Sequence, residues 1–209
     1  MVQKKNNEII INPENPKVLN DYLEAVRDDD KERLDSASEE LSKHIIGKVG
    51  KAIKVLYKND SFLLESEMNE MTICGRLAMY LQEEFKDFKG YYVDTEYYRL
   101  KVPRAKANFR KDRIRCDILF HSRGANKSRV DNLLAIEAKL EGNPDDGDKD
   151  ITRLEDFVMP EPPGATEEVV HSTLVGLFLR FGKNCSVMRI TPVDINVGIE
   201  DNNANKEGE

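Results

Sequence analysis

The sequence has few of the residues that build disulfide frameworks and zinc centres. Its three cysteines, Cys74, Cys116 and Cys185, are widely spaced and form no CxxC pair. This spacing argues against a disulfide framework and a structural zinc site, so we expect free thiols. The three histidines form no HxxxH or HExxH motif, which argues against a histidine-rich zinc centre.

Long apolar runs are also lacking. No run approaches the roughly 18 residues that a membrane-spanning helix needs. Residues 1–16 contain lysines but no apolar core or small-residue cleavage site, so we expect no signal peptide. With 209 residues, 39% hydrophobic and 34% charged, the chain fits one soluble domain with a substantial core. These features predict a cytoplasmic protein without a membrane partner.

Charge is distributed unevenly along the chain. The net charge is −7, which by itself argues weakly against a nucleic-acid-binding protein. Residues 99–115, however, hold eight basic residues and a single acid, for a local net charge of +7. We expect this basic segment to bind nucleic-acid phosphates; a solvated loop is the alternative interpretation. Its basic members are Arg99, Lys101, Arg104, Lys106, Arg110, Lys111, Arg113 and Arg115.

Helical and strand-like segments follow one another along the chain and predict a mixed α/β domain. Apolar residues at three- and four-residue steps predict helices, and β-branched or aromatic runs predict strands. The run NLLAIEAKL is typical of a central strand covered on both faces. The expected helices are 17–28, 34–57, 66–88 and 148–158, and the expected strands are 91–99, 114–121, 132–140, 171–182 and 186–192.

Ionic residues interrupt the apolar strands. Glu137 and Lys139 are two residues apart, so they project from one face of their strand, and Asp117 lies in the strand before it. Buried charges are paired or bind a metal, and carboxylates on neighbouring strands suit a hard cation such as Mg²⁺. Such a cation would activate water and offset charge on a phosphate, while Lys139 would orient or deprotonate the water or stabilise the transition state. An ion pair on a solvated strand is the alternative interpretation.

The third expected helix contributes a fourth acid. Glu70 lies on the same helical stripe as the apolar Ile73, Cys74 and Leu77, so we expect its side chain to face the sheet. There it would be a further metal ligand, direct or through water, with Glu67 one turn earlier as the fallback. The alternative is an acid that interacts only with the helix dipole.

Four blocks of sequence, in this order, resemble the PD-(D/E)xK nuclease superfamily, whose fold is restriction endonuclease-like. Within it they are similar to a group of uncharacterised bacterial restriction-endonuclease-like proteins. The blocks are NE…RLAMYLQ (69–82), VDTEYYR (93–99), CDILFHSRG (116–124) and NLLAIEAKL (132–140). The resemblance covers about residues 66–182; Cys116 replaces the usual proline and Tyr98 the usual asparagine.

The resemblance implies an enzyme: a Mg²⁺-dependent nuclease, in which Mn²⁺ can substitute, that hydrolyses phosphodiester bonds in DNA. Asp117, Glu137 and Glu70 would be the metal ligands and Lys139 the catalytic lysine. It also implies a restriction endonuclease-like core, a mixed sheet flanked by helices. The order of segments adds an N-terminal helical extension outside the resemblance and a tail low in apolar residues, so we expect a helical extension (1–62), a nuclease-like domain (63–195) and a disordered tail (196–209).

Some roles and partners stay open at this stage. Arg123 would meet a phosphate, His121 is a general base or a hydrogen-bonded structural residue, and Glu96 joins the acids or pairs with an arginine. The DNA is double- or single-stranded, and a homodimer is consistent with the resemblance. The N-terminal helices would bind a protein partner. The alternative function is a catalytically silent nucleic-acid-binding or protein-assembly module that retains the nuclease fold.

Overall fold

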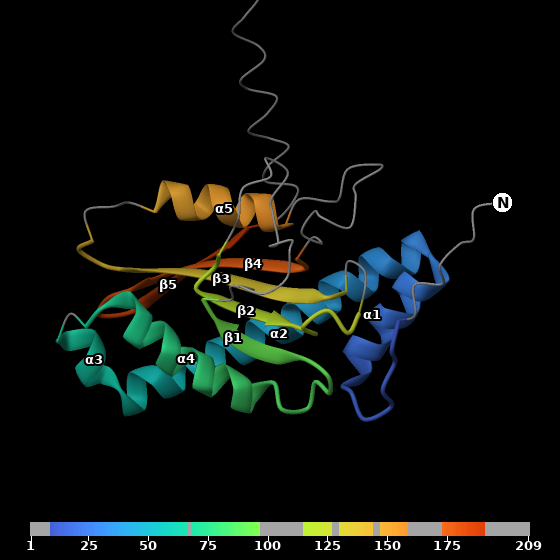
Figure 1. Cartoon of the computed structure of the whole chain (residues 1–209), viewed down its shortest axis with the longest axis horizontal. Coiled ribbons are helices and arrows are strands. Elements are labelled where there is room, and N and C mark those ends of the chain that lie inside the picture. Colours follow the sequence, from blue (N-terminus) through green and yellow to red (C-terminus); the bar gives the residue numbers. More distant parts are fainter. Residues whose placement is uncertain are drawn as a thin grey trace, which may run out of the picture.

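A five-stranded mixed sheet forms the centre of the molecule in the computed structural model, which describes residues 9–66, 68–96, 115–126, 130–143, 147–158 and 173–190. The strands follow their sequence order across the sheet (Figure 1), and all neighbours are antiparallel except β3 and β4, which are parallel. The predicted mixed α/β class is confirmed. The strands are β1 (Tyr92–Thr95), β2 (Ile118–His121), β3 (Asn132–Leu140), β4 (Val175–Phe181) and β5 (Cys185–Ile190).

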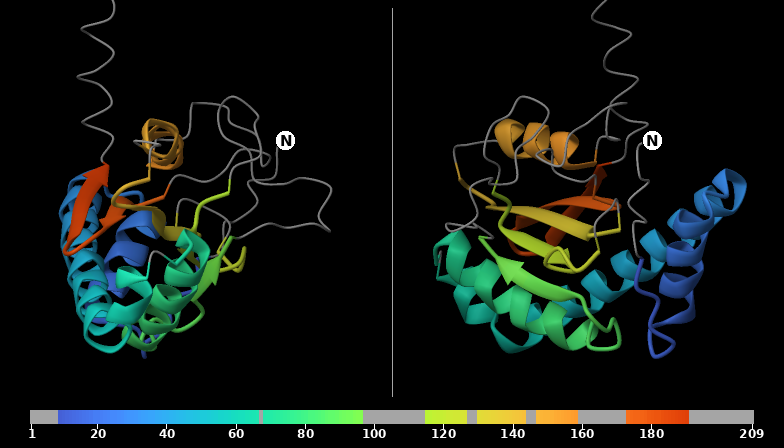
Figure 2. Two further views of the ribbon diagram at one scale, coloured as in Figure 1. Left: turned by 90° about the vertical axis from the view of Figure 1, so that its left-hand side faces the viewer. Right: turned by 45° about the vertical axis from the view of Figure 1, so that its right-hand side comes forward.

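Helices cover both faces of the sheet. The parallel pair β3–β4 needs a crossover, and helix α5 (Asp148–Val158) lies between these strands in sequence and packs on one face. The other helices lie across the opposite face (Figures 1 and 2). They are α1 (Lys17–Asp28), α2 (Lys31–Asn59), α3 (Ser61–Glu65) and α4 (Glu70–Glu84).

The alternation of β3 divides its side chains between two hydrophobic clusters. Ile136 and Ala138 pack into the large cluster with α1, α2 and α4, whereas Ala135 packs into a smaller cluster beneath α5. Because side chains alternate along a strand, Glu137 and Lys139 share the α5 face with Ala135. The functional residues predicted on β3 are therefore placed under α5.

The N-terminal helices contribute to the same core as the sheet. Apolar side chains of α1 and α2 are buried in one cluster with those of α4 and the strands, for example Leu23 and Ile45. The division at residues 62 and 63 stays a prediction. Within the described residues, no helix is long and apolar enough to cross a membrane.

Two expected elements are shorter than their apolar patterns indicate. The helix expected at 66–88 begins at Glu70, because the Asn69 side chain caps it by accepting from Thr72 N at 2.9 Å. It ends at Glu84, and Phe85 and Phe88 then pack on Phe120 from a turn instead of a helix. The strand expected at 114–121 is regular only from residue 118.

Candidate active site

Asp117 lies where the pairing between β2 and β3 stops. Ile118 and Ile136 form the last paired positions, and beyond them Asp117 Oδ2 accepts a hydrogen bond from Ala138 N at 2.8 Å. The main-chain oxygen of Asp117 accepts from Glu96 N, which ties it to the end of β1. The side chain thus replaces a strand partner at this edge of β3.

Glu70 completes the same edge from the start of α4. Its Oε1 atom accepts from Leu140 N at 3.2 Å and from Asn143 Nδ2 at 2.8 Å. The structure therefore brings Glu70 to the sheet, as its helical stripe predicts; its role as a metal ligand stays a prediction. Glu67, the fallback acid, lies outside the described residues.

Lys139 and Glu137 each meet a side chain from α5. Lys139 Nζ lies 3.1 Å from Asp150 Oδ2 and 3.7 Å from Glu70 Oε2. Glu137, only 2% exposed, is contacted by Arg153, whose Nη1 lies 2.7 Å from Oε1. The same nitrogen lies 3.1 Å from Asp150 Oδ1. A continuous ion-pair network thus joins α4, β3 and α5.

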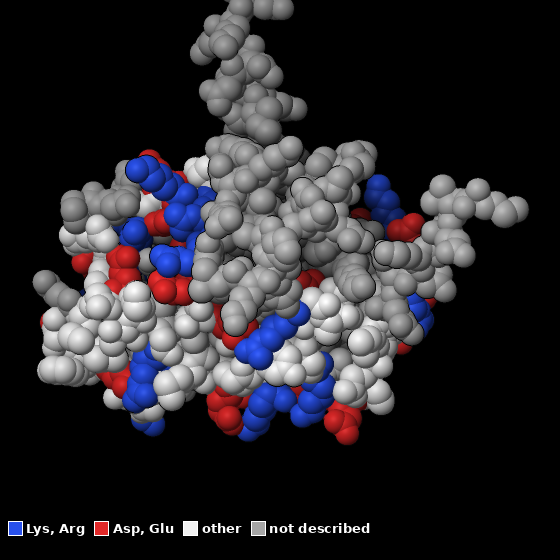
Figure 3. All heavy atoms as spheres, viewed as in Figure 1, with Lys and Arg blue, Asp and Glu red and all other residues white. Residues whose placement is uncertain are grey.

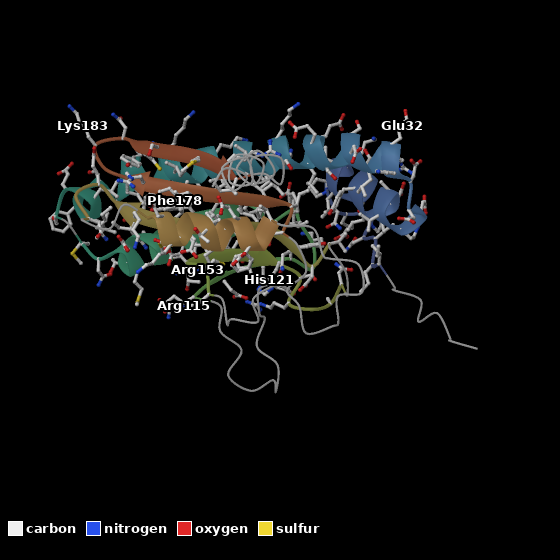
Figure 4. The ribbon with its side chains drawn as sticks, turned by 90° about the horizontal axis from the view of Figure 1, so that it is seen from above. Glu32, Arg115, His121, Arg153, Phe178 and Lys183 are labelled. Carbon is white, nitrogen blue, oxygen red and sulfur yellow. The ribbon has the colours of Figure 1, made fainter. Side chains whose placement is uncertain are left out.

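Asp150 and Arg153 are site residues that the sequence analysis missed. They lie three residues apart on α5, next to Leu154 and Phe157, which are buried against the sheet. Figure 4 shows Arg153 on the same side of the molecule as Arg115. The sequence does contain a signal for Asp150 and Arg153. The helix that follows the strand with Glu137 and Lys139 has a polar pair on its otherwise apolar stripe.

Acids outnumber cations in this network. Among the described residues, the carboxyl groups of Glu70, Asp117, Glu137 and Asp150 face the cationic groups of Lys139 and Arg153. Figure 3 shows acidic and basic atoms side by side below α5, on the left of the view. Four acids thus face two cations, and the network can hold a shared proton or a further cation.

The buried acids are held away from their usual ionisation range. Burial raises the pKa of Glu137 to about 8, with a further contribution from Asp117 and an opposing one from Arg153. Burial also raises the pKa of Asp117, although the hydrogen bond from Ala138 opposes the shift. The pKa of the Cys74 thiol is raised by burial and then by Asp117. These shifts show carboxyl groups that are buried and close enough to interact with one another.

A pocket of about 330 Å³ opens beside Asp117, between the start of α4 and the end of β1. Glu96 has a φ of 45°, a left-handed conformation that costs energy for a residue with a side chain, and it pairs with Arg115 at 3.5 Å. Glu96 thus combines both expectations, as it lies near the acids and has an arginine partner. The lining includes Glu70, Glu96, Asp117, Cys74, Thr95 and Arg115.

His121 and Arg123, two accessory residues of the sequence pattern, both bind Asp94. His121 is fully buried, with Nε2 3.0 Å from Asp94 Oδ2, as expected of a structural histidine. Arg123 binds both oxygens of Asp94 and lies 4.3 Å from the centre of the Tyr92 ring. Although burial opposes the shift, hydrogen bonds from Arg123 and His121 lower the pKa of Asp94.

The basic segment lies almost entirely outside the described residues. Of its eight basic members, Arg115 is described, and it lines the pocket beside Asp117. Its main-chain oxygen is also 3.4 Å from Arg153 Nη1. The other seven, Arg99, Lys101, Arg104, Lys106, Arg110, Lys111 and Arg113, lie outside them.

Carboxylate oxygens are the ligands that a hard cation prefers, but in this structure Lys139 and Arg153 are paired with acids of the network. In the part of the chain that the structure describes, no three His, Cys, Asp or Glu side chains already stand at metal-binding separation. Asp117 and Glu137 nevertheless supply buried carboxyl oxygens that interact with each other, and a divalent cation would offset the charge of both groups once they are ionised. Asp117 and Glu137 would hold the ion, with Glu70 beside them.

A comparison with protein families, one with curated proteins and one with solved structures each found no match for the chain. No relative therefore assigns a role to these residues, and their chemistry has to follow from their geometry.

Proposed function

We propose that the chain is a Mg²⁺-dependent nuclease that hydrolyses phosphodiester bonds in DNA, built on a restriction endonuclease-like core. One observation carries the proposal: Asp117, Glu137 and Lys139 lie at one end of adjacent strands, in a network whose acids outnumber its cations among the described residues. Glu70 reaches the same strand end from α4. This is the acid–acid–lysine set that the sequence pattern predicts.

The chain's own residues would divide the work at this site. Asp117 and Glu137, with Glu70, would bind Mg²⁺ or Mn²⁺, which when bound lowers the pKa of water and offsets charge on a phosphate. Lys139 is the ammonium group that would orient or help to deprotonate the attacking water, or stabilise the pentacovalent phosphate. Its contact with Asp150 at 3.1 Å limits where that ammonium group can lie.

DNA is the proposed substrate because of the basic segment at 99–115. Its +7 charge over 17 residues is more than a solvated loop needs, and it ends at Arg115, which lines the pocket. The acidic remainder of the chain would repel DNA elsewhere and restrict docking to this region. Arg123 contributes less to phosphate binding than the sequence suggests, because its guanidinium already binds Asp94.

A substrate panel tests the proposal. Purified protein is incubated with supercoiled plasmid, single-stranded DNA and RNA in Mg²⁺, Mn²⁺ or EDTA. We expect DNA to be cut only with metal, and Lys139→Ala to slow cutting about 100-fold or more. Lys86→Ala, which removes an exposed lysine paired with Glu83, is the matched control and should cut like the wild type. Cutting that survives Lys139→Ala points to a contaminant, and no metal-dependent cutting of any substrate contradicts the proposal.

A catalytically silent module that binds nucleic acid or assembles with proteins is the second candidate. The contact between Arg153 and Glu137 favours it, since a protein cation already neutralises a would-be metal ligand. The same assay separates the two candidates when binding is measured beside cutting. DNA binding in EDTA and in Mg²⁺, without any cutting, would support the silent module.

A further inference from the structure

One guanidinium nitrogen lies at the junction of three segments. Arg153 Nη1 is 2.7 Å from Glu137 Oε1 on β3 and 3.1 Å from Asp150 Oδ1 on its own helix. It is also 3.4 Å from the main-chain oxygen of Arg115, just before β2. Arg153 therefore stands at the carboxylates that the proposed function assigns to a divalent cation.

The two partners of this ion pair differ in their exposure. Glu137 is 2% exposed, whereas the Arg153 side chain is 33% exposed. The helix that carries Arg153 is anchored by Leu154 and Phe157, which are buried against the sheet. The guanidinium reaches a buried acid from the solvent side, so its head can leave while α5 stays packed.

A guanidinium and a divalent cation on the same carboxylate repel each other strongly at such short range. Acids outnumber cations among the described residues of the network, which favours a further cation, but Glu137 Oε1 is already in contact with Arg153. Asp150 offers Arg153 a partner on the same helix, three residues away. The arginine can thus give up Glu137 without becoming unpaired.

We propose that Arg153 is a resident counter-ion that a divalent cation displaces: its guanidinium stabilises Glu137 in the metal-free protein and withdraws to Asp150 when the cation binds. This inference rests on the proposed function, because it assumes a divalent cation at Asp117 and Glu137. The inference adds that the divalent cation and the Arg153 guanidinium compete for the Glu137 carboxylate. The opposite arrangement is a permanent ion pair that holds Glu137 in place with or without metal.

Thermal unfolding of the full chain without nucleic acid tests the substitution. The wild type and Arg153→Gln are melted in EDTA and in saturating Mn²⁺. In EDTA we expect Arg153→Gln to melt roughly 5 °C or more below the wild type, because the buried carboxyl group of Glu137 loses its charged partner. In Mn²⁺ the two should melt at the same temperature, since the ion replaces the guanidinium.

Arg189→Gln is the matched control. Arg189 is also 33% exposed and also pairs with a glutamate, Glu39 at 3.2 Å, which lies on α2. Any loss of stability in Arg189→Gln should be the same in EDTA and in Mn²⁺. Should Arg153→Gln fail to fold, Arg153→Lys keeps the charge but loses the fork of donors, and its smaller deficit should also close in Mn²⁺.

The remaining outcomes separate this inference from the proposed function. If Mn²⁺ raises the melting temperatures of the wild type and Arg153→Gln equally, the metal site stands and Arg153 is a permanent partner, which overturns the inference. If Arg153→Gln melts like the wild type in EDTA, the arginine does not stabilise Glu137, and the inference is likewise overturned. If Mn²⁺ stabilises neither protein, the metal site fails, and both proposals fail with it.

Discussion

At the end of β3, side-chain carboxylates replace a neighbouring strand as the hydrogen-bond partners of the main chain. The N–H groups of Ala138 and Leu140 donate to the carboxylates of Asp117 and Glu70. Main-chain donors inside a protein need a partner, and an acid that accepts from one is fixed in position. The sheet itself therefore holds these two acids at the site, and the ion pairs of α5 position the remaining residues.

Asp150 is expected to position Lys139. Replacing it with asparagine removes the negative charge 3.1 Å from Nζ, so we expect kcat to fall about 10-fold through loss of orientation. KM should change little, because Asp150 is buried and its charge acts on Lys139. Steady-state cleavage kinetics measure both constants. Asp150→Glu, which keeps the charge, should retain more activity than Asp150→Asn, and an equal loss in both would contradict a charge-based role.

Glu137 should make the metal-free protein less stable as pH rises. Its pKa is raised from 4.5 to about 8, so the folded state binds this proton more tightly than the unfolded state does. The resulting stabilisation is complete below about pH 4.5 and is lost between there and pH 8. Glu137→Gln has no proton to lose. Urea unfolding in EDTA should show the variant gaining about 2–4 kcal/mol relative to the wild type from pH 5.5 to pH 8.5, whereas parallel profiles would refute the shift.

At the scale of elements, what the sequence predicts depends on how local the signal is. The bounds of β3 and α5 match the expected 132–140 and 148–158, because a continuous apolar run and an amphipathic stripe are properties of the segments themselves. The expected end of α4 is wrong, because Phe85 and Phe88 continue the apolar spacing from a turn. Packing against Phe120, a distant residue, decides that end.

The candidate site was predictable only in part for the same reason. The shared face of Glu137 and Lys139 follows from backbone geometry, and the inward direction of Glu70 follows from its helical stripe. The apolar stripe of α5 includes Asp150 beside Leu154 and Phe157, but the segment itself does not tell which strand this stripe covers. Asp150 and Arg153 become site residues because the parallel β3–β4 connection lays α5 over β3.

The entry to α5 offers a test of how firmly this helix is placed. Gly147 has a φ of 90°, and a Cβ there would lie 2.5 Å from the Phe178 ring. Gly147→Ala should therefore lower the free energy of unfolding by about 2–4 kcal/mol, from strain and overpacking together. Gly142→Ala is the matched control, with φ of 94° and open space around its Cβ, and should lose only about 1–2 kcal/mol. Equal losses in urea unfolding would show that the Phe178 contact does not constrain α5.

At the scale of the whole molecule, the two faces of the sheet differ: one carries most of the hydrophobic core and the other carries the candidate site. One face is packed against α1, α2 and α4 in a large hydrophobic cluster, and the other carries the ion-pair network under a single helix. The mixed α/β class could be predicted from the order of segments. The contribution of the N-terminal helices to the central core could not, because it depends on contacts between residues far apart in sequence.

DNA binding by the basic segment is a prediction at this scale. Replacing Arg110, Lys111 and Arg113 with glutamate should weaken DNA binding in EDTA and reduce its dependence on salt, because fewer counterions are released. Fluorescence anisotropy at several salt concentrations gives the affinity and the salt slope. An unchanged affinity with an unchanged slope would exclude this segment as the DNA-binding surface. Replacing Lys17, an exposed lysine on α1, with glutamate is the control and should have little effect.

The most direct test of the account is the rate at which the protein nicks supercoiled plasmid in Mg²⁺, compared between the wild type and Asp117→Asn. Asparagine keeps an acceptor for Ala138 N but removes the charge that would bind the ion. We predict that the wild type nicks in Mg²⁺ and not in EDTA. The rate for Asp117→Asn should be reduced by about 100-fold or more. Glu83→Gln, which changes an exposed acid at the end of α4, should nick at the wild-type rate. A wild-type protein that does not nick in Mg²⁺, or an Asp117→Asn variant that nicks at the wild-type rate, would contradict the account.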